Sequence, residues 1–74
     1  MTKEQKFLMK LGRRVRKLRK SKGYSQDRLY LEAGFSRGTM SKIEAGSVNV
    51  KIGTLLKIAE TIGVSLWTLV DVRE

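Results

Sequence analysis

The sequence predicts an all-α protein, a compact bundle of five short helices around one core. Apolar residues recur three or four positions apart in five successive segments, which is the spacing of one helical face. Serines and glycines stand at most boundaries between these segments, where they favour helix starts and stops. The 74 residues contain no proline and no linker-like stretch, so we expect residues 1–74 to form a single domain.

The first predicted helix covers residues 3–21. Its apolar face carries residues three and four positions apart: Leu8, Leu11, Val15 and Leu18. Gly23 follows, and a glycine can adopt the left-handed conformation that ends a helix. The outward face is basic and carries Arg13, Arg14, Arg16, Lys17 and Lys20.

The second predicted helix covers residues 26–33. Ser25 precedes it at the position where a serine side chain caps the first turn. Leu29 and Ala33 lie four apart on its inward face, and Gly34 marks its end.

The third predicted helix covers residues 37–45 and follows the same pattern. Ser36 is its cap and Gly46 its stop. Met40 and Ile43 are its inward residues.

Two further helices follow a loop at residues 46–51. Val48 and Val50 could form a short strand there, but no other segment offers a partner, so we favour a loop. The fourth helix is expected at residues 52–62, with a buried face of Leu55, Ile58, Ala59 and Ile62. Ser65 would cap the fifth, at residues 66–71.

The second and third predicted helices have the dimensions of a helix-turn-helix. Each has about two turns, and a short connection containing Gly34 joins them. Such short helices cross steeply, which leaves the second one prominent. Its outward positions carry small residues and hydrogen-bond donors: Ser36, Arg37, Gly38, Thr39, Ser41 and Lys42. The major groove of DNA accepts one helix, and arginine fits the two acceptors of guanine, so this pattern favours DNA recognition.

The charge is strongly positive and unevenly distributed. Sixteen Lys and Arg oppose seven Asp and Glu, which gives a net charge of +9. Residues 1–42 hold a net +10 and residues 43–74 a net −1. This balance favours a polyanionic partner, although a solvated basic face is the plainer interpretation of charge alone.

Several classes of function are disfavoured by composition. The chain has neither cysteine nor histidine, and its acidic residues are scattered, so we expect no metal, no cofactor, no small-molecule ligand and no enzymatic activity. Nowhere do 18 apolar residues follow one another. We therefore expect a cytoplasmic protein that does not bind membranes.

Three stretches together resemble the helix-turn-helix regulators of the phage-repressor and Cro type. They are LGRRVRKLRKSKG, GYSQDRLYLEAGFSRGTMSKIEAG and TLLKIAETIGVS, in that order and spacing. The resemblance covers roughly residues 11 to 70. It implies a lambda-repressor-like five-helix domain that binds double-stranded DNA as a homodimer, with its third helix in the major groove.

The resemblance also implies roles for individual residues. Those at base-reading positions are Arg37, Gly38, Thr39 and Lys42. Those expected to contact phosphate are Gln26, Ser36, Ser41, Arg16, Lys17 and Lys20. For the base-reading residues the alternative is ordinary solvated surface, and for Gln26 it is an ordinary residue in the first turn of a helix.

Two other features concern how the helices pack. The resemblance implies a buried salt bridge between Arg19 and Glu44, and Arg19 lies at the border of the apolar face of its helix, so its charged end can turn inward. Tyr30 stands where the family most often has alanine, and its bulk could open the angle between the second and third helices or turn the ring outward.

The C-terminal segment SLWTLVDVRE carries more apolar surface than a small monomer should expose. The resemblance implies a dimer interface here, and we expect the candidate residues to divide between core and dimer contact: Leu66, Trp67, Leu69 and Val70. The alternative is that all four complete the core.

The function that these features predict is a sequence-specific DNA-binding transcriptional regulator, acting as a homodimer on a pseudo-palindromic operator. The opening FLMKLGRRVRKLR and the short length favour a controller protein of a restriction-modification operon. The alternative is an antitoxin-type protein-interaction module that also binds DNA.

Overall fold

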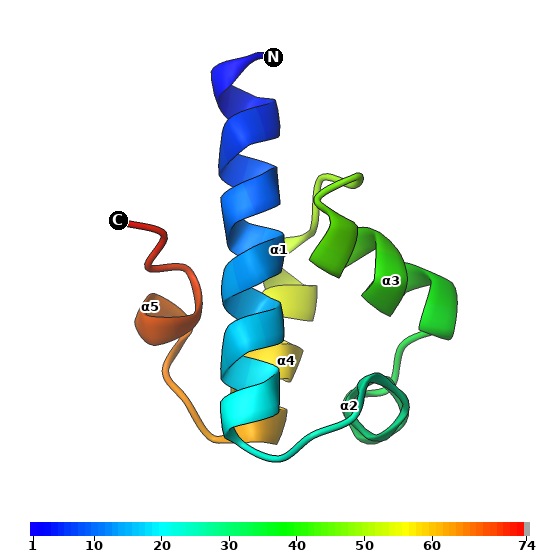
Figure 1. The fold of residues 1–74 in the computed structure, drawn as a ribbon. Helices are drawn as coiled ribbons and strands as arrows, with labels where there is room; N and C mark the ends of the chain where they lie inside the picture. The colour runs from blue at the N-terminus through cyan, green and yellow to red at the C-terminus, as the bar shows by residue number, and fades with distance from the viewer. Residues whose placement is uncertain (74) are drawn as a thin grey trace.

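The computed structural model describes residues 1–73, which form a compact unit of 32 × 23 × 20 Å. No strand occurs in this range. Figure 1 shows five helices in chain order: α1 (Lys3–Ser21), α2 (Gln26–Ala33), α3 (Arg37–Ala45), α4 (Ile52–Ile62) and α5 (Leu66–Leu69). The bundle places α3 and α5 on opposite sides of α1 (Figure 1).

Side-chain caps mark where four of the five helices begin, and α4 starts without one. Ser25, Ser36 and Ser65 each accept a hydrogen bond from a backbone N–H three residues on, which stabilises each helix start by about 1 kcal/mol. At the start of α1, Thr2 and Gln5 form a reciprocal capping box that the sequence analysis did not anticipate.

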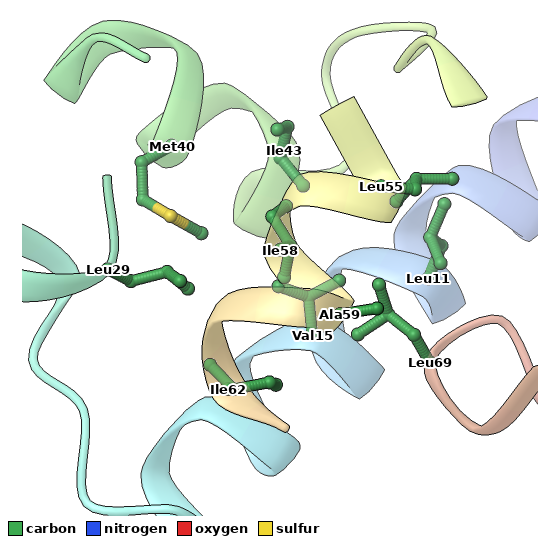
Figure 2. Close-up of a cluster of buried hydrophobic side chains, with 10 residues drawn as sticks. All are labelled: Leu11, Val15, Leu29, Met40, Ile43, Leu55, Ile58, Ala59, Ile62 and Leu69. Carbon is green, nitrogen blue, oxygen red and sulfur yellow. The ribbon is translucent and has the colours of Figure 1, made fainter. Parts of the chain in front are cut away.

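The core draws side chains from all five helices. Figure 2 shows these side chains pointing toward a shared centre. The buried set comprises Leu11, Val15, Leu29, Met40, Ile43, Leu55, Ile58, Ala59, Ile62 and Leu69. Since α2 to α5 are each too short to be stable alone in water, this shared burial holds the bundle together.

Two glycines allow α1 to lie directly against α3 and the residues after it. A Cβ on Gly12 would come within 2.5 Å of the Ile43 carbonyl oxygen, so only glycine fits where α1 crosses α3. Gly46 has a φ of 72°, and a Cβ there would lie 2.7 Å from the Met9 Cα. The position of α3 therefore depends on close backbone contact as well as on side-chain packing.

The fifth helix is shorter than the sequence predicted. It ends at Leu69 rather than at residue 71, and the N–H of Val70 closes its last turn on the Leu66 carbonyl. A carboxylate is unfavourable at a helix C-terminus. Asp71 instead accepts hydrogen bonds from the backbone and the guanidinium of Arg73.

The segment between α3 and α4 is a loop, as expected. Val48 and Val50 are half-buried and pack against the core from this loop. They anchor the connection without forming a strand.

Candidate nucleic-acid interface

Helices α2 and α3 form a helix-turn-helix. They pack against each other and are joined by residues 34–36, with Gly34 in the left-handed conformation and Phe35 packed against the core. Tyr30 of α2 is likewise half-buried against the core. Its ring is therefore not turned fully into solvent.

The outer face of α3 is open to a ligand. Met40 and Ile43 are buried, whereas Arg37, Gly38, Ser41 and Lys42 are exposed. The helix thus presents its polar residues outward, in the arrangement that the spacing predicted.

Two hydroxyl groups at the start of α3 are already engaged. The Ser36 hydroxyl oxygen accepts from the Thr39 N–H at 3.1 Å and lies 2.8 Å from the Thr39 hydroxyl. Ser36 is therefore first of all the cap of α3. Thr39 is half-buried, so it is less open than its neighbours Arg37 and Gly38.

Arg37 is held only loosely. Its Nε lies 3.8 Å from the Asp27 carboxylate of α2, and the Arg37 side chain is 76% exposed. An exposed pair of this kind contributes at most about 1 kcal/mol. The guanidinium is thus free to leave Asp27 for a ligand.

A buried polar network fixes α3 relative to α1 and α2. The Arg19 Nε donates to Glu44 at 2.7 Å and its Nη2 to the other carboxylate oxygen at 3.1 Å. The two side chains are only 8% and 5% exposed. Arg19 and Glu44 therefore form the expected ion pair.

Gln26 joins this network, which the sequence analysis did not foresee. Its Nε2 donates to the Glu44 carboxylate at 2.9 Å, so the first residue of α2 is tied to α3. The remaining guanidinium nitrogen of Arg19 donates to the Tyr24 carbonyl at 2.8 Å. No buried side-chain nitrogen or oxygen in the described range lacks a partner.

The basic residues of α1 do not share one face. Arg16 lies one turn after Gly12 and Lys20 one turn after Arg16, so both lie beside α3 and both are exposed. Lys17 instead lines a hollow next to Asp71, on the side of α1 that faces the C-terminal segment of the chain. The structure thus separates Lys17 from the other expected phosphate contacts.

The C-terminal apolar residues are divided between core and surface. Leu69 is fully buried in the core, so of the four dimer candidates it falls on the core side and is not available to a partner. Leu66 and Val70 are half-buried, whereas Trp67 is 78% exposed. Phe7 and Ile52 were not among the expected interface residues. Both are exposed, and they line a mostly apolar hollow together with Val70.

Residues 1–73 offer neither a cluster of metal-ligating side chains nor a membrane-spanning helix. They hold no group of three potential metal-ligating side chains. None of the five helices has the length and apolar character needed to cross a lipid bilayer.

A five-helix bundle with an exposed polar α3 in a helix-turn-helix defines the class of helix-turn-helix transcriptional regulators, which bind DNA and are not enzymes. A profile of the helix-turn-helix family matches residues 15–66, and the chain belongs to that family.

Known proteins of the same fold support this assignment. SlrR, a helix-turn-helix transcriptional regulator of Bacillus subtilis (strain 168), is 42% identical over 62 residues, which are 82% of this chain and 41% of SlrR. The crystal structure of the restriction-modification controller protein C.AhdI from Aeromonas hydrophila has a TM-score of 0.81 at 35% identity and covers 84% of this chain and 94% of C.AhdI. The crystal structure of SinR, the master regulator for biofilm formation, in complex with DNA has a TM-score of 0.78 at 37% identity and covers 82% of this chain and 98% of that one.

The chain matches only part of several relatives. It spans between 41% and 56% of the length of three curated Bacillus subtilis regulators. The shared part is the helix-turn-helix region.

Proposed function

We propose that this protein is a homodimeric, sequence-specific transcriptional regulator that binds a pseudo-palindromic operator. The observation that carries the proposal is the outer face of α3, which is exposed and polar while its inner face is locked to α1 and α2 by the Arg19–Glu44–Gln26 network. A rigid, outward-facing helix of this kind fits the major groove. The solved complex of SinR with DNA supports DNA as the partner.

Base recognition rests on the outward residues of α3. Arg37 has a free guanidinium that can donate two hydrogen bonds to guanine. Lys42 and Thr39 offer further donors. Gly38 has nothing within 4 Å of the position of a Cβ, so it permits close approach of the helix to the bases.

Phosphate contacts flank this helix. Gln26 keeps one amide hydrogen and its amide oxygen beyond the bond to Glu44. Ser36, Ser41, Arg16 and Lys20 lie around the same side of the molecule and are exposed. Each phosphate that such a residue contacts steepens the dependence of log affinity on log salt by about 0.9.

The dimer forms through the apolar surface around α5. Trp67 is its central residue because it is the most exposed large apolar side chain of the described chain. Leu66 and Val70 border it from the edge of the core. A second copy placed there gives two α3 helices for two half-sites about one helical turn of DNA apart.

The regulated genes in this proposal belong to a restriction-modification operon. Support comes from C.AhdI, a restriction-modification controller protein that this chain matches over 94% of its length. As a regulator of bacterial genes, the protein would act in the cytoplasm.

Selection from a random duplex library tests the proposal. The purified protein should enrich an inverted repeat at about 0.15 M salt, where the Debye length is about 8 Å and weak surface attraction is damped. Lys57→Ala, which removes an exposed charge from α4, should enrich the same repeat. If the selection recovers unrelated sequences, and the affinity changes with salt but not with sequence, the protein contacts phosphate without recognising bases.

A further inference from the structure

A hollow of about 210 Å³ lies between α1 and the C-terminal segment, and the helix-turn-helix does not account for it. It is lined by Lys10, Arg13, Arg14, Lys17, Asp71 and Arg73. Its lining residues Asp71 and Arg73 follow α5, and α5 and α3 lie on opposite sides of α1 (Figure 1). A group bound there would therefore occupy a different face of α1 from the one beside α3.

Two of the arginines make contacts within the protein. The Arg14 Nε donates to the Thr68 carbonyl oxygen at 3.0 Å, which ties α1 to α5. Arg73 donates from Nε and Nη2 to the two oxygens of Asp71, at 2.8 and 2.9 Å, in a surface pair in which the Arg73 side chain is 90% exposed. The Arg14 guanidinium at the wall of the hollow is thus partly ordered before any ligand arrives, which lowers the entropic cost of binding.

Apart from Arg14, the α1 cations of this hollow are not needed for the packing of α1. Its core face is formed by Leu11 and Val15, and of the α1 cations at the hollow only Arg14 donates a hydrogen bond within the protein. Lys10, Arg13 and Lys17 repel one another because they are three or four positions apart on one helix. One carboxylate, Asp71, faces five cationic groups. An additional anion would relieve this repulsion.

We propose that this hollow is a binding site for a phosphate group. Cationic side chains converge on it from two segments, α1 and residues 71–73, so donors approach from several directions. A tetrahedral phosphate accepts hydrogen bonds from several directions, whereas the acceptor positions of a carboxylate lie in one plane. Arginine also matches two phosphate oxygens at once. The site takes either a backbone phosphate of nucleic acid or a free phosphate compound, and it does not depend on the proposed operator.

Titration of the protein with inorganic pyrophosphate, followed by NMR, tests the site directly. We expect saturable shifts at residues 10–17 and 71–73, including the Arg14 Nε–H. The variant Arg13→Gln/Lys17→Gln removes two exposed cations of the hollow and should weaken pyrophosphate binding by about tenfold or more, since two charge-assisted contacts are lost. The control Lys51→Gln/Lys57→Gln removes equal charge outside it and should bind like the wild type.

Three results would overturn the assignment. One is a set of shifts that grows linearly with concentration and spreads over all lysines and arginines. Another is equal affinity in the two double variants, whose folding is checked by their thermal unfolding. The third is tighter binding at this hollow by an acidic peptide, hexaglutamate, than by pyrophosphate.

The same variants identify the source of the phosphate. If duplex DNA displaces pyrophosphate, and Arg13→Gln/Lys17→Gln lowers the salt slope of DNA binding by about 1.8, the site holds two backbone contacts. If pyrophosphate stays bound beside the duplex, the site serves a free phosphate compound. Both results retain the phosphate site.

Discussion

Glu44 is the residue on which the position of α3 depends most. Its carboxylate accepts two hydrogen bonds from Arg19 and one from Gln26, so three helices meet at one buried group. Such a group is costly to leave unpaired because burial removes it from water. Its role here is to fix the geometry of the helix-turn-helix.

Replacing Glu44 by alanine should destabilise the protein by about 3–5 kcal/mol, because the buried Arg19 charge then loses its partner. Urea unfolding measures the change. The matched control is Glu32→Ala, which breaks the exposed pair with Arg28 and should cost less than about 1 kcal/mol. Equal losses in the two variants would mean that the Arg19–Glu44 pair is not buried in solution.

Asp71 should keep its charge in acid. Hydrogen bonds from the Arg73 side chain and backbone lower the pKa of Asp71 to about 2. Since the folded pKa is lowered, the stabilising contribution of this contact is present above the ordinary pKa near 3.8 and is lost as the pH falls toward 2. An NMR titration of the carboxyl carbon should show this, and Arg73→Ala should return the pKa toward 3.8. A midpoint near 3.8 in the wild-type protein would refute the contact.

At the scale of single helices, the crossing of α1 and α3 is set by Gly12. Within a helix, glycine normally lowers stability relative to alanine by about 1 kcal/mol. Here the missing Cβ lets the α3 carbonyls approach, and no side chain fits in that space.

Gly12→Ala should therefore destabilise the protein, by about 1–3 kcal/mol, through overpacking. Gly53→Ala in α4 is the control, because nothing lies within 4 Å of its Cβ position, and it should be neutral or stabilising. Thermal unfolding separates the two. A stabilised Gly12→Ala protein would show that α1 and α3 lie farther apart than in this structure.

The sequence predicts those features of the helices that depend on neighbouring residues better than those that depend on contacts between helices. Serine caps and apolar spacing are local, so the bounds expected for α1 to α4 agree with the structure. The end of α5 was wrong because Asp71 pairs with Arg73, a contact that periodicity does not register. The roles of Gly12 and Gln26 were missed because both follow from contacts between helices, which the spacing within one helix does not register.

At the scale of the whole molecule, the two proposed activities, DNA recognition and dimer formation, use different faces. The exposed polar face of α3 is one, and the apolar surface around Trp67 is the other. Leu69 is an example of a residue whose apolar character alone could not distinguish a core position from an interface position. Its burial in the structure places it in the core.

The dimer should depend on Trp67. Trp67→Ser should shift the protein to monomer in sedimentation equilibrium without unfolding it, because this side chain is 78% exposed in the single chain. Leu31→Ser on α2 removes a comparably exposed apolar side chain, 70% exposed, and should leave the dimer intact. A Trp67→Ser protein that stays dimeric would place the interface elsewhere.

In the proposed function, α3 recognises bases through Arg37. We would measure the affinities of the wild type and Arg37→Ala for the selected operator and for the operator with its G·C pairs replaced one at a time by A·T. One symmetric replacement should reduce the binding free energy of the wild type by about 1–3 kcal/mol per half-site. The same replacement should leave the binding free energy of Arg37→Ala almost unchanged. If Arg37→Ala instead loses affinity equally for every duplex, Arg37 contacts phosphate alone and the account of base recognition is wrong.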